Sequence, residues 1–324
     1  MKTPQRQRLS TPSLRDRSLW ATDYRWRLRD TYRAPLRVIR GCFNIAQLSL
    51  LNKYRRSLIT QLGGPVVSLT THGERILKVH LAIESVALGH LLPSRIILWL
   101  DDSSLFQNLP APIRRLQDRG LEVLLTRNYG PHTKYYPYIE SEHSFHSPLV
   151  TADDDIIYPR YWLRTLIEAY REFSNAVNCY RARVVEADGH DMRPYHTWEL
   201  CTSTDASFRN VPTGVSGTVY PPSFQSVLKK AGSAFEACCP ANDDIWLHVQ
   251  AIRAGIKVRQ ISRRARHFPI IPGTQKVSLY RTNVTQDDGN DQQAKATYQE
   301  TDLEILRNSE TVRRTTAGSP AQRT

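Results

Sequence analysis

Three consecutive carboxylates at residues 153–155 directly follow an apolar stretch and are the first candidates for chemistry. Adjacent like charges repel one another, and the repulsion costs more free energy when the side chains leave water. Residues 148–152 before them predict a short buried strand, and residues 156–170 after them predict a helix with Pro159 near its first turn. Clustered carboxylates at the carboxyl end of a buried strand need a counter-charge, which a hard divalent cation such as Mg2+ or Mn2+ can supply. The alternative is a solvated turn whose acids cap the following helix.

Strands and helices alternate before these acids, and their order determines where polar residues meet. The predicted strands are at 65–71, 94–102, 121–126 and 147–155, and the predicted helices are at 74–88 and 111–120. Such alternation predicts an α/β fold, a mostly parallel sheet with helices on both faces. Ligands of such sheets bind beyond the carboxyl ends of the strands. The polar residues expected at this edge are Thr70, Thr71, His72, Arg75, Asp101, Asp102, Asp153, Asp154 and Asp155.

The second half of the chain is less regular. The predicted elements there are a strand at 175–187, a Gly- and Pro-rich loop or hairpin at 211–222, a helix at 241–255 and a strand at 256–261. Asn242 or Asp243 caps the helix, and Gly255 stops it. We predict three parts of the chain, namely a basic amphipathic N-terminal extension at 1–62, a folded α/β domain at 63–307 and a disordered tail at 308–324.

The positive charge belongs to the N-terminal segment. The chain has a net charge of +13, and residues 1–62 hold fourteen Lys or Arg and three Asp, so their net charge is 14 − 3 = +11. Residues 35–51 predict a helix with an apolar face of Leu36, Ile39, Phe43, Ala46 and Leu50. Basic amphipathic helices bind anionic membrane surfaces, so we expect peripheral contact with the inner face of the cytoplasmic membrane. The alternative, that this face packs on the folded domain, stays open.

Several protein classes are disfavoured by composition. The sequence has no run of eighteen apolar residues, and its N-terminus lacks the apolar core of a secretory signal. None of the five cysteines forms a CxxC pair, which indicates a reducing cytoplasm without structural disulfides or a zinc site. The pI of about 9.7 and the Arg-, Trp- and Tyr-rich residues 20–33 are compatible with nucleic-acid binding. The near-neutral remainder of the chain makes nucleic acid the less favoured partner.

Four stretches resemble, in the same order, those of GT-A glycosyltransferases of the bacterial family 2-like kind. They are VVSLTTHGERI at 66–76, IILWLDD at 96–102, TADDDIIYP at 151–159 and ANDDIWL at 241–247. The resemblance spans roughly residues 65–260 and implies a GT-A-type nucleotide-binding sheet. It also implies a metal-dependent enzyme that moves a sugar from a nucleotide-sugar donor to a glycan or lipid-linked acceptor in bacterial surface polysaccharide synthesis.

The resemblance assigns the acid cluster to a metal. A nucleotide-sugar donor has a diphosphate leaving group, whose charge Mn2+ or Mg2+ neutralises by bridging phosphate oxygens to carboxylates. Alternate residues of an extended segment can be aimed at one point, so Asp153 and Asp155 are the expected metal pair. Asp154 then points away or toward the sugar. His267 is a further candidate metal ligand, with a structural role as its alternative.

The resemblance also implies a donor site at the other strand ends. Thr70, Thr71 and Arg75 are expected at the nucleoside and diphosphate, because hydroxyls suit ribose and arginine suits phosphate. Asp101 or Asp102 is expected to accept a hydrogen bond from the base or ribose. The alternatives are a helix cap for Thr71, a solvated first-turn arginine and a plain turn for the two acids.

Lys134, between the third strand and the acid cluster, is expected to contact the diphosphate, with a surface lysine as the alternative.

The second acidic pair, Asp243 and Asp244, stands where the family usually has Glu-Asp at a helix start. Asp244 is the expected base, which deprotonates the acceptor hydroxyl in an inverting displacement. Asp243 shares this catalytic assignment, or is only a helix cap. Gly214 and Gly217 allow close approach of the backbone to a sugar.

Clustered acids would also serve a metal-dependent phosphotransferase or nucleotidyltransferase. The sequence lacks a P-loop and the Asp-x-Asp-x-Thr pattern of aspartyl-phosphate enzymes, which weakens that alternative.

Overall fold

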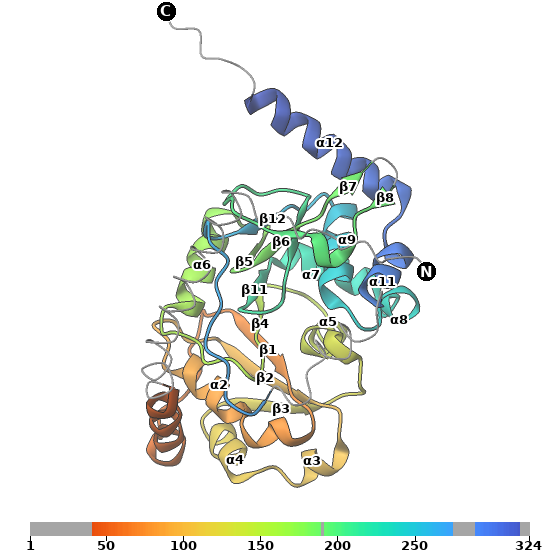
Figure 1. Cartoon of the computed structure of the whole chain (residues 1–324). Helices are drawn as coiled ribbons and strands as arrows, with labels where there is room; N and C mark the ends of the chain where they lie inside the picture. Colours follow the sequence, from red (N-terminus) through yellow and green to blue (C-terminus); the bar gives the residue numbers. More distant parts are fainter. Residues whose placement is uncertain (1–40, 189–190, 275–288, 318–324) are drawn as a thin grey trace, which may run out of the picture. The chain divides into compact units, whose positions relative to one another are not determined.

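The computed structural model describes residues 41–188, 191–274 and 289–317 and divides into two compact units, Met1–Gln47 and Leu48–Thr324. The second unit contains a seven-stranded sheet in the order β12-β5-β11-β4-β1-β2-β3 (Figure 1). Its strands are β1 (Val66–Thr70), β2 (Arg95–Leu100), β3 (Leu121–Leu125), β4 (Leu149–Thr151), β5 (Val177–Cys179), β11 (Thr218–Tyr220) and β12 (Val258–Gln260). The neighbouring strands pair in parallel except at β11, which is antiparallel to β4 and β5. The prediction of an α/β fold with a mostly parallel sheet is confirmed.

Helices cover both faces of the sheet (Figure 1). Residues 41–54 are helical. The further helices are η1 (Gly73–Leu77), α2 (Val79–Ala87), α3 (Ser103–Gln107), α4 (Ala111–Gln117), η2 (Gly130–Lys134), α5 (Tyr136–Ser141), α6 (Trp162–Glu172), η3 (Tyr195–Thr197), α7 (Pro222–Ala231), α8 (Phe235–Cys238), α9 (Asp243–Arg253), α11 (Gly289–Thr297) and α12 (Glu300–Ala317). Side chains alternate along β2, because Ile97 and Trp99 join one buried cluster while Ile96, Leu98 and Leu100 join the other. Such strands are buried on both faces, which is why they read as continuous apolar runs.

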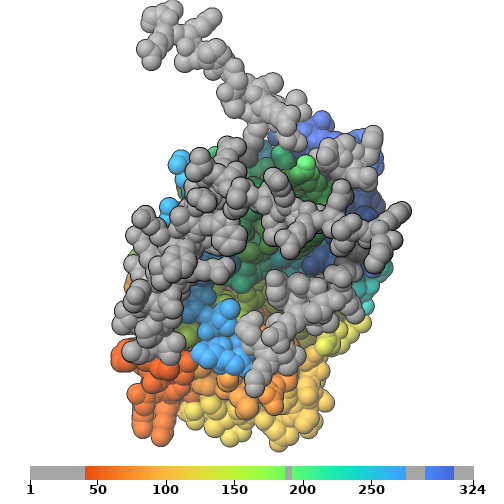
Figure 2. Space-filling view, in the orientation of Figure 1, coloured from red at the N-terminus to blue at the C-terminus, as the bar shows by residue number. Residues whose placement is uncertain are grey.

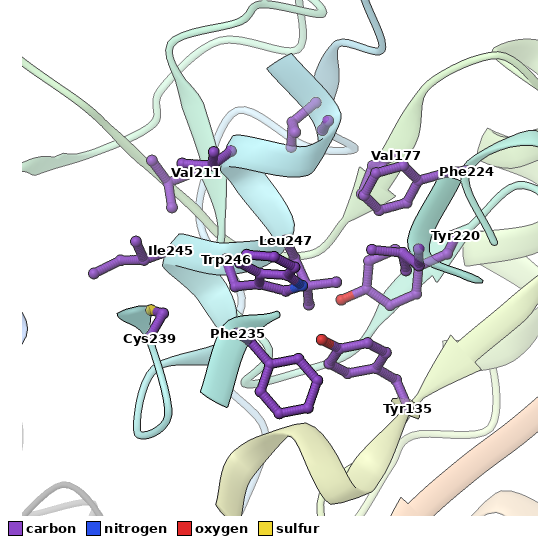
Figure 3. Close-up of a cluster of buried hydrophobic side chains, with 14 of the residues drawn as sticks. Tyr135, Val177, Val211, Tyr220, Phe224, Phe235, Cys239, Ile245, Trp246 and Leu247 are labelled. Carbon is purple, nitrogen blue, oxygen red and sulfur yellow. The ribbon is translucent and has the colours of Figure 1, made fainter. Parts of the chain in front are cut away.

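One buried cluster supports the start of α9. Figure 3 shows Tyr135, Tyr220, Phe235 and Trp246 facing one another between α9, η2 and the sheet. The rings of Phe235 and Trp246 lie 6.0 Å apart, and Phe235 also stacks on His132 at 3.9 Å. This aromatic packing holds the N-terminus of α9 beside the carboxyl edge of the sheet.

The second half differs from the prediction in its details. The strand predicted at 175–187 is divided between β5 in the main sheet and β6 (Ala182–Val184) in a second one, with β7 (Ala187–Asp188) at its end. The second sheet has the order β10-β6-β9, with β10 (Asn210–Pro212) and β9 (Glu199–Leu200), and β7 pairs with β8 (Asp191–Met192). The predicted loop or hairpin at 211–222 contributes to both sheets, because it joins β10 to β11.

The boundary predicted after residue 62 lies in a turn, and the one predicted after residue 307 falls inside a helix. The second unit begins at Leu48, before the predicted boundary at residue 62, and α12 continues to Ala317, beyond the tail predicted from residue 308. Residues 1–40 and 318–324, which include Leu36 and Ile39 of the predicted face, lie outside the described residues. Among the residues that the structure describes, no helix is long and apolar enough to cross a bilayer.

Residues 48–59 are tied to the sheet domain by a buried polar network. Asn52 donates from Nδ2 to Glu84 Oε1 at 3.1 Å, and Glu84 also accepts from Arg119 Nη1 at 2.5 Å. Arg119 donates from Nε to the Ser57 carbonyl at 2.9 Å. Glu84 is 0% exposed and Arg119 2%, so this ion pair is held in the interior. Leu48 and Ile59 are buried beside it, whereas Leu50 is exposed.

Loss of Glu84 is expected to destabilise the fold strongly. The change Glu84→Ala leaves the Arg119 guanidinium buried without a counter-charge, so the free energy of unfolding should fall by about 3–5 kcal/mol. Urea unfolding followed by circular dichroism measures it. The matched change Glu168→Ala breaks only the exposed Arg164–Glu168 pair on α6 and should cost less than about 1 kcal/mol. Equal losses for the two variants would contradict this role of Glu84.

Candidate active site

Charged side chains from three distant segments meet at the carboxyl edge of the sheet. Lys134, at the end of η2, donates from Nζ to Asp153 Oδ1 at 3.1 Å and lies 3.6 Å from Asp243 Oδ2. A Cβ atom built on Gly214 would lie 3.1 Å from Lys134 Nζ, 3.5 Å from Asp244 Oδ1 and 3.8 Å from Asp243 Oδ2. We call Lys134, Asp153, Asp243, Asp244 and Gly214 the central cluster. It joins the acid loop after β4 to the first turn of α9.

The sheet fixes the position of Lys134. Ser68 of β1 donates from Oγ to the Lys134 carbonyl at 2.7 Å, and Trp99 of β2 donates from Nε1 to Ser68 Oγ at 3.0 Å. Burial lowers the pKa of Lys134, but the charges of Asp153, Asp243 and Asp244 outweigh it and raise the pKa well above its usual value. Lys134 is therefore a charged bridge between two acidic segments.

Arg75 and Thr71 hold the other two acids of the loop. Asp154 accepts from Thr71 Oγ1 and from Arg75 Nη1, both at 2.6 Å, and it is buried. Asp155 accepts from Arg75 Nη2 at 2.9 Å, and Arg75 Nε donates to the Thr274 carbonyl at 3.1 Å. Asp154 thus points to Thr71 and Arg75. Thr71 therefore does not cap a helix, because its hydroxyl binds Asp154. Arg75 is not a solvated first-turn arginine, because it is ion-paired with Asp154 and Asp155.

The remaining predicted donor residues lie at strand ends but contact one another little. Thr70 donates from Oγ1 to the Trp99 carbonyl at 3.1 Å, and Asp101 accepts from Asn128 Nδ2 at 2.6 Å. Asp102 caps α3, because its Oδ1 accepts from the backbone N–H groups of Ser104 and Leu105 at 2.8 and 3.1 Å. The plain-turn alternative therefore describes Asp102, while a nucleoside contact of Thr70 or Asp101 stays a prediction.

The second acidic pair has a different environment for each member. Asn242 is the N-cap of α9, because its Oδ1 accepts from Ile245 N at 3.0 Å, so capping does not account for Asp243. Asp244 Oδ1 accepts from Gly214 N at 2.8 Å. Burial, and next the charge of Asp243, raise the pKa of Asp244 from 3.8 to about 7. A carboxylate with such a pKa can accept a proton near neutral pH.

A rigid loop at 213–217 lies against these acids. Gly217 has a φ of +104°, and a Cβ atom there would lie 2.7 Å from Trp162 Nε1. Ser216 also has a positive φ, 78°, and its carbonyl accepts from Trp162 Nε1 at 2.8 Å. Thr213 Oγ1 accepts from Arg181 Nη1 at 2.9 Å. Sequence reasoning did not select Ser68, Trp162 or Arg181, and only the positions of the glycines pointed to this loop.

The chemistry of the edge fits a hard divalent cation. The acid loop and the α9 pair bring five carboxylates together with the cations Lys134 and Arg75. Burial, followed by the charges of Asp153 and Asp154, raises the pKa of Asp155 to about 6, so a nearby cation would favour its charged form. Mg2+ commonly uses one or two carboxylates together with substrate phosphates.

The three expected metal ligands, Asp153, Asp155 and His267, do not form one site in the described residues. Within residues 41–188, 191–274 and 289–317, no three His, Cys, Asp or Glu side chains could share one metal ion. His267 therefore does not complete a site with Asp153 and Asp155 there. Burial, and next the charge of Arg181, lower the pKa of His267. Any metal at this edge would depend on the two acids and its substrate.

No family model and no curated protein matches the chain. Among solved structures, it is similar to the mannosyltransferase PcManGT from Pyrobaculum calidifontis in complex with GDP-Man and Mn2+, at 12% identity and TM-score 0.45, covering 86% of this chain and 84% of that one. It is similar to S. aureus TarS 1–349 at 13% identity and TM-score 0.40, covering 63% of this chain and 59% of TarS 1–349. A third is CMP:2-keto-3-deoxy-manno-octonic acid synthetase complexed with CTP, at 15% identity and TM-score 0.36, covering 60% and 87%.

The chain thus spans about three fifths of TarS 1–349. Because the TM-scores are low, we base the functional proposal on the residues of the site.

The raised pKa of Asp244 predicts a pH-dependent stability difference. Its folded pKa of about 7 exceeds the usual 3.8, so its contribution to stability is present below about pH 4 and is lost as the pH rises through 7. The change Asp244→Asn removes this titration. Relative to the wild type, the variant should therefore gain up to about 1.4 kcal/mol per pH unit between pH 5 and 7. Chemical unfolding at pH 5, 6, 7 and 8 measures the difference, and a pH-independent difference would contradict the assigned pKa.

Proposed function

We propose that this chain is a metal-dependent glycosyltransferase, which moves a sugar from a nucleotide-sugar donor to a glycan or lipid-linked acceptor in bacterial surface polysaccharide synthesis. The observation that carries the proposal is the bridge that Lys134 makes between Asp153 and Asp243. It joins a set of acids suited to a metal to the first turn of α9, where the neighbouring Asp244 has a pKa that suits a base. Sugar transfer needs both, one at the leaving diphosphate and the other at the attacking hydroxyl.

The acid loop would form the donor half of the site. Asp153 and Asp155 would hold Mn2+ or Mg2+, which when bound would neutralise the negative charge of the diphosphate. Arg75 and Thr71 hold Asp154 and so keep this loop in one conformation. Lys134 would hold its charge beside the diphosphate, since it stays protonated. Asp101 and Thr70, at the ends of β2 and β1, would contact the nucleoside.

Asp244 would serve the acceptor half. In the proposed step, the acceptor hydroxyl oxygen bonds to the anomeric carbon while the bond from that carbon to the phosphate oxygen breaks. The hydroxyl proton passes to the Asp244 carboxylate, and the nucleoside diphosphate leaves with the bonding electron pair. One base on the side of the attacking hydroxyl, opposite the leaving group, gives inversion of the anomeric configuration. Asp243, ion-paired to Lys134, would keep the pKa of Asp244 high.

We also propose a cytoplasmic enzyme that contacts the inner membrane surface. Leu50, Tyr54, Leu58 and Leu62 of the second unit are 57%, 65%, 62% and 99% exposed. Lys53 and Arg56 are exposed among them, so apolar and cationic side chains alternate along this short segment. Apolar insertion together with cationic attraction is how amphipathic segments bind anionic lipid. Lipid-linked acceptors would be found at that surface.

The metal role is tested by Asp153→Asn and Asp155→Ala. Both variants should lose Mn2+-dependent binding of UDP, GDP or CMP, whichever the wild type binds, and lose turnover by at least about a hundredfold. Titration calorimetry with and without EDTA measures binding, and circular dichroism checks the fold. Asp118→Asn, at the exposed end of α4, is the matched control. Full activity of the wild type in EDTA would refute the proposal.

The base role is tested by Asp244→Asn. This change should lower kcat by on the order of a hundredfold or more, because the acceptor proton loses its destination, while nucleotide affinity stays within about twofold. The wild-type kcat should fall as the pH drops below about 7, because protonated Asp244 cannot accept a proton. A nucleotide affinity that falls as far as kcat would place Asp244 in the donor half instead.

Membrane contact is tested by flotation with phosphatidylglycerol vesicles. The full chain should float with these vesicles at low salt and much less at high salt, because charge attraction is screened. The double change Leu58→Glu and Leu62→Glu should abolish flotation, and Leu200→Glu, at another exposed leucine, should not. Absence of flotation for the wild type would exclude membrane contact.

A further inference from the structure

Arg181 is a partly buried cation without an acidic partner among the described residues. Its Nε atom is buried and has no hydrogen-bond partner, while its Nη1 atom donates to Thr213 Oγ1. Other arginines of similar burial have carboxylate partners, as in Arg75 with Asp154 and Arg259 with Glu172. An unpaired charge taken out of water is costly unless something compensates it. We therefore asked what anion this guanidinium could receive.

Arg181 lies beside the proposed base. Two consecutive residues of the loop at 213–217 link them, because Thr213 binds Arg181 and Gly214 N donates to Asp244 Oδ1 at 2.8 Å. Thr213 is fixed to Arg181 in both directions, since its Oγ1 and its N–H donate to the Arg181 carbonyl at 3.2 and 3.0 Å. No ion pair is formed between Arg181 and Asp244 in the described part of the chain, so the guanidinium is not neutralised by the base.

A second arginine lies on the same segment, and the backbone of a third lies beside that segment. Arg183 is two residues along an extended segment that enters β6, so both side chains project from the same face. Arg183 donates from Nη1 to the Trp198 carbonyl at 2.5 Å and lies over the ring of Tyr195. Arg266 donates from its backbone N to the Tyr180 carbonyl at 3.2 Å, and its side chain is exposed.

These three guanidinium groups have no carboxylate partner within 4.0 Å among the residues that the structure describes, unlike Lys134 and Arg75. Arginine suits phosphate and carboxylate because its planar donors bind both oxygens of such groups. The position beside Asp244, at the far end of the central cluster from Asp153, is where the attacking substrate must place its hydroxyl.

We propose that Arg181, together with Arg183 and Arg266, binds an anionic group of the acceptor, a phosphate or a carboxylate, and so positions the acceptor hydroxyl at Asp244. This inference rests on the proposed glycosyltransferase function and specifies its acceptor class. Neutral sugars would be poor acceptors, because they would leave the partly buried Arg181 guanidinium without a compensating anion. Specificity of this kind comes from a site whose charged groups are left unpaired by the wrong substrate.

Binding of small anions tests the subsite without any requirement for turnover. The probes are glycerol 1-phosphate and glucuronate, with glycerol and glucose as their neutral counterparts, at constant ionic strength and in the presence and absence of UDP and Mn2+. Calorimetry should show that the full chain binds at least one of the anions and neither neutral probe, and the two anions distinguish phosphate from carboxylate. Arg181→Gln should weaken that binding at least tenfold. Arg164→Gln, at an exposed arginine paired with Glu168 on α6, should not change it.

Arg266→Gln gives a second measurement if Arg181→Gln fails to fold. The Arg266 side chain is exposed and its backbone contact with Tyr180 does not need it, so this variant should fold and should weaken anion binding about threefold. Anion affinities unchanged in a folded Arg181→Gln variant, or unchanged in Arg266→Gln where Arg181→Gln does not fold, would overturn the subsite. So would a wild type that binds neither anion.

A transfer assay separates this inference from the proposed function. With the donor that the wild type hydrolyses, the ratio of transfer to anionic over neutral acceptors should exceed ten and should fall toward one in Arg181→Gln. Equal transfer to both acceptor types by the wild type would overturn the subsite and leave the glycosyltransferase in place. Anion binding at Arg181 without turnover of any nucleotide sugar would overturn the proposed function instead.

Discussion

Excess negative charge at one edge of the sheet is the constraint on which the site depends. The loop at 153–155 and the start of α9 bring five carboxylates to this edge. Lys134 and Arg75 neutralise part of this charge through Asp153, Asp243, Asp154 and Asp155. Such a concentration of charge destabilises a folded protein, since like charges repel more strongly away from water, and it is typical of functional sites. Burial, and next the charges of Asp153 and Asp154, raise the pKa of Asp155 accordingly.

The two cations divide their tasks. Arg75 donates to Asp154 and Asp155 of the acid loop and to the Thr274 carbonyl, so it fixes the conformation of the acid loop. Lys134 instead spans two acids that are ninety residues apart in the sequence, and its backbone is fastened to β1. The position of η2 therefore sets the separation of the proposed donor and acceptor halves. A planar arginine suits the first task and a compact lysine suits the second.

The parallel core was predictable from the sequence because its strands are buried on both faces. β1, β2 and β3 appear as uninterrupted apolar runs, and the acids follow the last predicted strand of the first half. The three-residue β11 was not predicted as a separate strand, because its pairing with β4 and β5 is a long-range contact that no local pattern encodes. The same holds for Asn52, a polar residue that is buried because Glu84 and Arg115 satisfy it from distant helices.

The residue types of the candidate site could be predicted, but their pairing could not. Strand-end position and the four family-like stretches selected Asp153 and Asp244, and Lys134 was selected by its position between the third strand and the acid cluster. Nothing in the sequence indicates that Arg75 binds Asp154 or that Arg181 binds Thr213, because these contacts join residues 79 and 32 positions apart. The expected ligand His267 joins no metal cluster among the described residues for the same reason, since the turn after β12 is positioned by backbone contacts with β5 and the residue after it.

The loop at 213–217 shows how the fold maintains this arrangement. Ser216 occupies a positive φ, a conformation that costs a non-glycine residue about 1–3 kcal/mol and persists only where its surroundings determine it. The Ser216 carbonyl accepts a hydrogen bond from Trp162, and Ser216 Oγ donates to the Arg266 carbonyl at 2.7 Å. With both sides of the loop fixed, Gly214 presents its N–H to Asp244 and leaves room for Lys134. A strained loop clamped in this way is a preorganised support, because the position of Asp244 does not have to be found anew when substrate binds.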